Sequence, residues 1–166
     1  SGTDVATVRA SSTLPLIAAE FDRHYAARCG TRSQPYPQVV ETVRALRAQG
    51  VKLVVVTNKE SVYTRRVLDA HGLTPLFDRV ISGDSLPTKK PDPAGARWCM
   101  AELGVPAGRT LFVGDSSIDA ATARNAGVPV WLLPYGYNMG QPVSACGPDR
   151  VIPDFRALQH NAAVPV

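Results

Sequence analysis

The amino-acid sequence predicts a three-layer, Rossmann-like α/β protein built on a parallel β-sheet. Short apolar runs alternate with stretches of helical periodicity, and several of these helical stretches end at a glycine. The run VKLVVVT at residues 51–57 is apolar and β-branched at its centre, which is typical of a parallel strand buried on both faces. Polar residues follow several of these runs directly. Because parallel sheets bind ligands beyond the carboxyl ends of their strands, the polar residues predict a site at one sheet edge.

The expected elements alternate between residues 39 and 152. Strands are expected at residues 51–57, 79–82, 110–113, 128–133 and 150–152. Helices are expected at residues 39–49, 61–71, 93–103 and 118–126. Residues 135–148 form a Gly- and Pro-containing loop, and its unusual length for a compact domain indicates a role.

The amino-terminal region is expected to be helical. Leu14, Ile17, Phe21 and Tyr25 recur at steps of three and four residues, which predicts an amphipathic helix over residues 14–28. A stiff Pro-Tyr-Pro connector at residues 35–37 follows it. We therefore expect a small helical part at residues 1–34 and the sheet domain at residues 35–166.

Composition excludes several classes of partner. The 166 residues carry a net charge of +4, but the basic residues are scattered, which disfavours a nucleic-acid partner and suits a small anionic substrate. No apolar run approaches the roughly 18 residues of a membrane span, and residues 1–12 lack an apolar leader. The 3 cysteines are widely spaced, without a CxxC pair. A cytoplasmic protein with neither a membrane nor a nucleic-acid partner is expected.

Two carboxylates follow the apolar run at residues 110–113. Asp115 and Asp119 lie in GDSSID, where a carboxylate would face the edge of the sheet. Mg²⁺ takes hard oxygen ligands and often only one or two carboxylates, so Asp115 is the better direct ligand and Asp119 a supporting one, or a partner for a metal-bound water or a lysine. The alternative is that both are turn and helix-capping residues, which these residue types favour.

Three further residues suit a phosphate group. Thr57 and Asn58 end the first buried strand and offer a hydroxyl, an amide and exposed backbone N–H groups. Lys90, in TKKPDP, would neutralise phosphate charge and keep nearby carboxylates ionised. The alternatives are helix capping for Thr57 and Asn58 and a solvated basic turn for Lys89 and Lys90.

Taken in order, TN, KPDP and GDxxxD resemble the second, third and fourth motifs of the haloacid dehalogenase superfamily. The similarity runs from about residue 35 to residue 152. The segments GDSLPTKKPDP and YGYNMG resemble the phosphoglycolate phosphatases within it, and residues 14–37 resemble the end of their helical cap. The fold implied is the superfamily's Rossmann-like core with a remnant of that cap.

The resemblance implies a Mg²⁺-dependent hydrolase of a small phosphate monoester, best matched by 2-phosphoglycolate, which would be cleaved to glycolate and phosphate through an aspartyl-phosphate. It implies that Thr57 and the amide of Asn58 bind the phosphoryl group and that Lys90 contacts phosphate and nucleophile. Asp115 would hold Mg²⁺ with Asp119 in support. Within the superfamily, a pyrophosphatase, a phosphonate hydrolase or a sugar-phosphate mutase is the alternative.

One part of the pattern is not found. The family's DxDxT motif, which carries the nucleophile on the first, central strand, has no match here, because Asp4 follows no apolar strand and has no second carboxylate nearby. We therefore expect a fragment that begins inside the cap and lacks the first strand of its core. The alternative is a degenerate, non-catalytic protein that binds phosphate or a partner. The strands at residues 51–57 and 110–113 are expected to lack their central neighbour, leaving an inactive chain of low stability.

Overall fold

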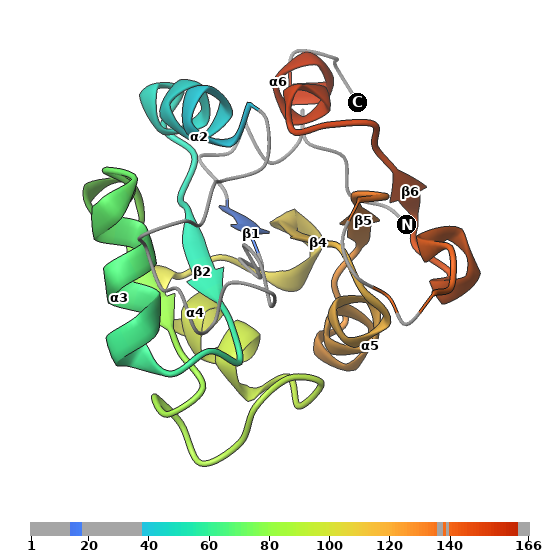
Figure 1. Ribbon diagram of the computed structural model, residues 1–166, viewed down its shortest axis with the longest axis horizontal. Helices are drawn as coiled ribbons and strands as arrows, with labels where there is room; N and C mark the ends of the chain where they lie inside the picture. Colours follow the sequence, from blue (N-terminus) through green and yellow to red (C-terminus); the bar gives the residue numbers. More distant parts are fainter. Residues whose placement is uncertain (1–13, 18–37, 136–137, 139, 163–166) are drawn as a thin grey trace.

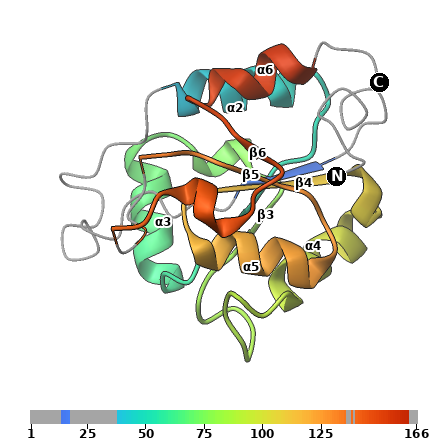
Figure 2. The same ribbon diagram turned by 90° about the vertical axis from the view of Figure 1, so that its right-hand side faces the viewer.

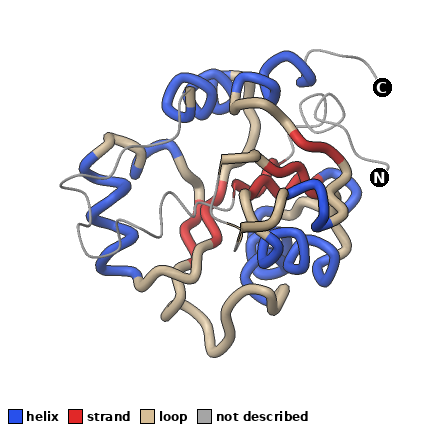
Figure 3. The backbone as a smooth tube through the Cα atoms, turned by 45° about the vertical axis from the view of Figure 1, so that its right-hand side comes forward, coloured by secondary structure: helices blue, strands red, loops and turns tan. Residues whose placement is uncertain are grey.

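A computed structural model describes residues 14–17, 38–135, 138 and 140–162 of the chain. Its centre is a six-stranded sheet with the order β3-β2-β1-β4-β5-β6, in which every neighbouring pair is parallel. Helices lie on both faces of this sheet (Figures 1, 2 and 3). The predicted three-layer α/β class is therefore confirmed.

The element bounds agree closely with those expected from residue 39 onward. The strands are β1 (Leu14–Ile17), β2 (Val54–Val56), β3 (Arg79–Ile81), β4 (Thr110–Gly114), β5 (Val130–Leu132) and β6 (Arg150–Val151). The helices are α2 (Val39–Ala48), α3 (Ser61–Ala70), α4 (Ala94–Leu103), α5 (Ser117–Ala126) and α6 (Arg156–Ala162), the last of which the sequence analysis did not predict. Short 3₁₀ turns are η2 (Thr74–Leu76), η3 (Ala107–Arg109) and η4 (Val143–Cys146), and η4 shortens the predicted loop.

Two apolar cores sandwich the sheet. On one face, α2, α3 and α6 cover Val55, Val113 and Trp131; on the other, α4 and α5 cover Val54 and Phe112. Alternate residues of β2, β4 and β5 therefore lie in opposite cores, as in a parallel sheet buried on both sides. Cys99 of α4 lies in the second core, where burial raises the pKa of its thiol to about 12, so it stays protonated and inert.

The central strand of the sheet corrects two of the predictions. Residues 14–17, expected to begin a helix, form β1 between β2 and β4. Leu16 is paired in register with both Val54 and Phe112. The expectation that the strands on either side of this place lack a central neighbour is thus wrong, because β1 pairs with both of them. The absence of the family's own DxDxT strand stays a prediction.

The rest of the predicted amino-terminal region lies outside the described residues. This applies to residues 1–13, which include Asp4, and to residues 18–37, which include the rest of the expected helix and cap remnant. Within the described part of the chain, no helix is long and apolar enough to span a bilayer.

Candidate functional site

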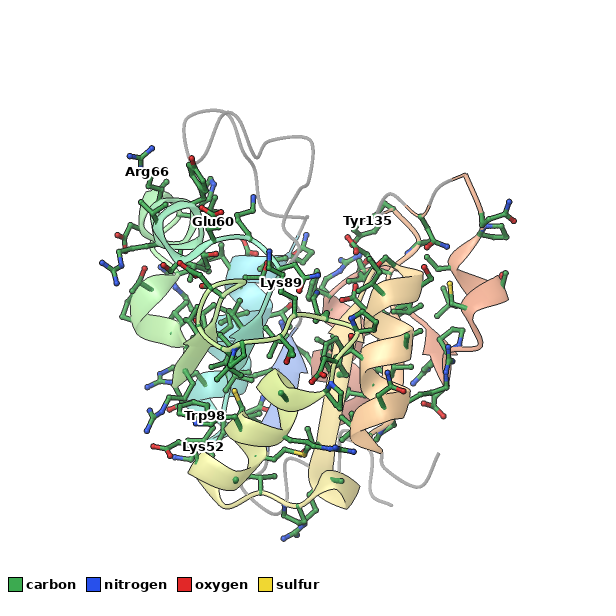
Figure 4. All side chains as sticks on the ribbon, turned by 90° about the horizontal axis from the view of Figure 1, so that it is seen from below. Lys52, Glu60, Arg66, Lys89, Trp98 and Tyr135 are labelled. Atoms are coloured by element: carbon green, nitrogen blue, oxygen red, sulfur yellow. The ribbon has the colours of Figure 1, made fainter. Side chains whose placement is uncertain are left out.

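Polar residues gather where the strands end. Figure 4 shows Glu60, Lys89 and Tyr135, which follow β2, β3 and β5, toward one end of the molecule, whereas Lys52 and Trp98 lie toward the other end. The long loop from β3 to α4, yellow-green in Figure 1, carries Lys90 at this carboxyl edge. The candidate site is built from this loop, the end of β2 and the turn from β4 into α5.

A buried ion pair joins two of these segments. The Lys90 ammonium lies 2.7 Å from Oδ1 of Asp119, and their side chains are 2% and 0% exposed. The other oxygen of Asp119, Oδ2, accepts hydrogen bonds from the backbone N of Asp115, at 2.9 Å, and from Oγ of Ser116, at 3.2 Å. Three donors thus satisfy this carboxylate, as a charge removed from water requires.

The three hydrogen bonds that Asp119 accepts bear on its predicted role. A carboxylate engaged in this way orients the lysine, which was one of the two supporting tasks considered for it. Direct metal ligation by Asp119 stays a prediction, since a carboxylate offers about four lone-pair sites and three hydrogen bonds already use most of them.

The position of Asp119 also explains why residue 114 is a glycine, a requirement that was not predicted from the sequence. A Cβ on Gly114 would lie 2.3 Å from Cβ of Asp119 and 2.5 Å from its Oδ2, far inside van der Waals contact. The first residue of the GD pair must therefore be glycine for the buried carboxylate to reach the amide of Asp115. The glycine could have been recognised from its place at the end of a buried strand.

Asn58 holds the backbone of Lys90 in place. Its Nδ2 donates to the Lys90 carbonyl at 3.0 Å, and its Oδ1 accepts from the Lys90 N–H at 2.8 Å. Asn125 of α5, which the sequence analysis missed, donates to the neighbouring Pro91 carbonyl at 2.9 Å. These hydrogen bonds engage the side chain of Asn58. The contact with phosphate that is expected of Asn58 would therefore be made by its backbone N–H.

Thr57 keeps a donor available. It is 2% exposed, its backbone N donates to the Ile81 carbonyl at 2.9 Å, and its Oγ1 accepts from the Lys59 N–H at 3.1 Å. Among the described residues, no acceptor takes the hydroxyl proton of Thr57. A hydroxyl has one donor and two acceptor sites, so Thr57 retains the proton that a phosphate oxygen would accept.

Asp115 lies directly after β4 and is 5% exposed. Within the residues that the structure describes, no group of three His, Cys, Asp or Glu side chains forms a protein-only metal cage. Such a cage is not what Mg²⁺ requires, because it is usually held by one or two carboxylates together with waters and phosphate oxygens. Asp115, whose backbone N donates to the buried Asp119 carboxylate, therefore suits a Mg²⁺ site with few protein ligands.

The loop after β5 is fastened to the same turn. Asn138 is 8% exposed, its Oδ1 accepts from the backbone N of Ser117 at 2.9 Å, and its Nδ2 donates to the Gln141 carbonyl at 3.2 Å. The long loop noted in the sequence is thus tied to the first residue of α5. No sequence feature indicated this contact, because the loop is separated along the chain from the other motifs.

The family model for "Haloacid dehalogenase-like hydrolase" matches residues 6–133 of this chain. Two curated relatives are phosphoglycolate phosphatases. The one from Vibrio parahaemolyticus is 40% identical over 144 residues, which cover 87% of this chain and 63% of the relative. The one from Pseudomonas putida is 45% identical over 130 residues, which cover 78% of this chain and 48% of the relative.

A solved structure is also similar to this chain. The crystal structure of a predicted phosphoglycolate phosphatase from Haemophilus somnus has a TM-score of 0.77 and 39% sequence identity, covering 82% of this chain and 61% of that chain. The chain therefore spans about half to two thirds of the length of the proteins it resembles.

Proposed function

Because this chain belongs to the haloacid dehalogenase-like hydrolase family, we propose that it supplies much of the active site of a Mg²⁺-dependent phosphatase acting on a small phosphate monoester. The observation that carries the proposal is the buried Lys90–Asp119 pair beside Asp115. A lysine held out of water at the carboxyl edge of a parallel sheet suits the binding of a transferring phosphoryl group.

Each residue has a proposed task. The Lys90 ammonium and the Thr57 hydroxyl donate to phosphate oxygens, and the Asn58 backbone N–H adds a third donor. Asp119 holds the Lys90 ammonium in place, and Asp115 would hold Mg²⁺. When bound, the metal would neutralise negative charge on the phosphate. Because these donors are placed before the substrate arrives, little reorganisation is needed as charge develops.

The covalent step is proposed to follow the family's scheme. A carboxylate attacks phosphorus and the ester P–O bond breaks, while a second carboxylic acid gives its proton to the departing oxygen, so the alcohol leaves and an aspartyl-phosphate remains. The second carboxylate then takes a proton from water, which attacks phosphorus, so that inorganic phosphate is released and the first carboxylate is restored. No residue of this chain is assigned as the nucleophile, and the residues named above support the reaction without forming the covalent bond.

The proposed substrate is 2-phosphoglycolate, cleaved to glycolate and phosphate. Support comes from the names of the relatives and from the GDSLPTKKPDP and YGYNMG segments, not from the geometry of the described site. We expect the complete gene product to rank 2-phosphoglycolate first by kcat/KM in a panel with pyrophosphate, a phosphonate and hexose phosphates. Pyrophosphate in first place would replace the proposed activity with a pyrophosphatase, and phosphate binding without turnover of any ester would indicate a non-catalytic protein.

Replacing Asp115 by Asn should remove most of the Mg²⁺-dependent turnover of the complete gene product. The change keeps the size of the side chain but removes one of the few anionic ligands available to the metal. Initial rates over a Mg²⁺ titration measure this, and the matched control is Asp92→Asn, an exposed carboxylate of the β3–α4 loop. Turnover of Asp115→Asn equal to that of the control would contradict the assignment of Asp115.

A further inference from the structure

A pocket lies on the sheet face that α3 covers. Its volume is about 310 Å³, within the range of small-molecule sites, and five of its eight lining residues carry a hydroxyl group. Leu68 and Val80 provide apolar surface. The polar residues that line this α3–β3 pocket are Ser61, Thr64, Arg65, Thr74, Ser82 and Ser85.

Three of the hydroxyl groups are already in use. The Ser61 hydroxyl donates to Oδ2 of Asp84 at 2.8 Å, and the Thr64 hydroxyl donates to the Glu60 carbonyl at 3.0 Å. The Thr74 hydroxyl donates to Oδ1 of Asp69. These three groups therefore offer an incoming ligand no free proton.

The remaining donors of the pocket have no acceptor among the described residues. Ser82 is only 4% exposed, and its hydroxyl has no hydrogen-bond partner within the described part of the chain. The Ser85 oxygen accepts from the Ser82 backbone N at 2.8 Å, which leaves the Ser85 proton unused among the same residues. Arg65 is exposed on α3, and its guanidinium has neither a carboxylate nor a carbonyl partner in the described ranges. A buried hydroxyl without a partner is uncommon in folded proteins and calls for an explanation.

The excess of hydrogen-bond donors over acceptors in the pocket indicates the kind of ligand that it would bind. Two hydroxyl protons and a guanidinium can all donate, so the complementary group is rich in acceptors and negatively charged, as an oxyanion is. Asp69 and Asp84 border the pocket through their bonds to Thr74 and Ser61. Their charge opposes a phosphate dianion more strongly than a monoanion.

We propose that the α3–β3 pocket binds a small monocarboxylate through Arg65, Ser82 and Ser85, with its short carbon chain against Leu68 and Val80. The site is distinct from the Lys90–Asp119 pair, because Val80 and Leu68 belong to the core under α3, whereas α5 covers the opposite face. The proposal does not rest on the proposed phosphatase function, and its test measures binding only.

The test follows backbone amide shifts of the full chain by NMR during titration with acetate and propionate, with chloride at equal ionic strength as the reference and inorganic phosphate as a second arm. Saturable shifts are expected at Thr64, Ser82 and Ser85, with phosphate binding more weakly. Arg65→Gln should weaken carboxylate binding about tenfold or more, since a charge-assisted hydrogen bond is lost. The matched control is Arg66→Gln, whose guanidinium lies 6.0 Å from the Tyr63 ring centroid.

Ser82→Ala provides an independent measurement. Deleting an unpartnered buried hydroxyl should leave the Tm without ligand unchanged or raise it, while the rise in Tm caused by the carboxylate is lost. Absence of saturable shifts would mean that water fills the pocket and would overturn the proposal. Equal losses in Arg65→Gln and Arg66→Gln would show a general charge effect, and tighter binding of phosphate would overturn the choice of a carboxylate.

Discussion

Lys90→Met is expected to lower the free energy of unfolding by about 3–5 kcal/mol, the usual cost of removing one partner from a buried ion pair. The Asp119 carboxylate is 0% exposed, so the substitution leaves a negative charge in the protein interior with two neutral donors, Asp115 N and Ser116 Oγ. Urea unfolding followed by circular dichroism measures the change. The methionine fills a similar volume, so a cavity contributes little to the loss.

A double-mutant cycle separates the charge from the packing. Asp119→Asn alone should also be destabilising, because it leaves the Lys90 ammonium without a counter-charge. The combined Lys90→Met and Asp119→Asn protein buries no charge and should be more stable than the sum of the single losses predicts. The control is Glu102→Gln, which breaks the exposed pair with Arg79, at 3.2 Å, and should cost about 0–1 kcal/mol. Additive losses in the cycle would show that the Lys90–Asp119 pair is not formed in solution.

Gly83→Ala should be the next most damaging change, with an expected loss of about 3 kcal/mol, at the upper end for overpacking. A Cβ at this position would lie 2.1 Å from the backbone oxygen of Asn58 and 2.8 Å from its carbonyl carbon. Backbone atoms cannot move aside by changing rotamer. The loop that begins at Gly83 must therefore shift away from Asn58, and the two hydrogen bonds that hold Lys90 weaken with it.

The matched control for this change is Gly108→Ala in η3. A Cβ on Gly108 meets nothing within 4 Å, so the two variants make the same chemical change with and without a collision. Thermal unfolding of both proteins tests the prediction, and equal Tm values would contradict it. An amide-shift map of Gly83→Ala should also show the largest changes at Asn58 and Lys90.

From residue 39 onward, most of the fold could be predicted from sequence because each element carries a local signal. The β-branched run at residues 54–56 indicates burial on both faces, and Val54 and Val55 do point into opposite cores. Gly104 and Gly127 end α4 and α5 in the left-handed conformation, with φ of 67° and 76°. Helix α6 was missed because its seven residues include few apolar positions from which to read a period.

Strand β1 was mistaken for the start of a helix. The spacing of Leu14 and Ile17 suits a helix face, and Pro15 argues against a central strand because it has no N–H to donate. β1 is defined by its pairing with β2 and β4, two segments that are distant from it in sequence. The periodicity of four residues cannot predict such a pairing.

The sequence indicated which residues would gather at the candidate site, but not the hydrogen bonds between them. The strand-end rule indicated that Thr57, Asn58, Lys90, Asp115 and Asp119 would lie at one edge, and hydrogen bonds join Asn58 to Lys90 and Lys90 to Asp119. Which partner each side chain selects depends on side-chain orientation, so sequence did not indicate the Asn58 contact with the Lys90 backbone. The catalytic tasks of these residues stay predictions.

The position of β1 also has a consequence during translation. Leu14 pairs with Thr110, so nearly a hundred residues separate β1 from one of its two neighbours in the sheet. At the usual rate of synthesis, β1 is made roughly 5–20 s before β4. The pairing of β2 with β3 is far more local, since Val54 meets Arg79, and it can form in that interval. The strand at the centre of the finished sheet therefore acquires its second neighbour late, and until then one of its hydrogen-bonding edges is open to other nascent chains.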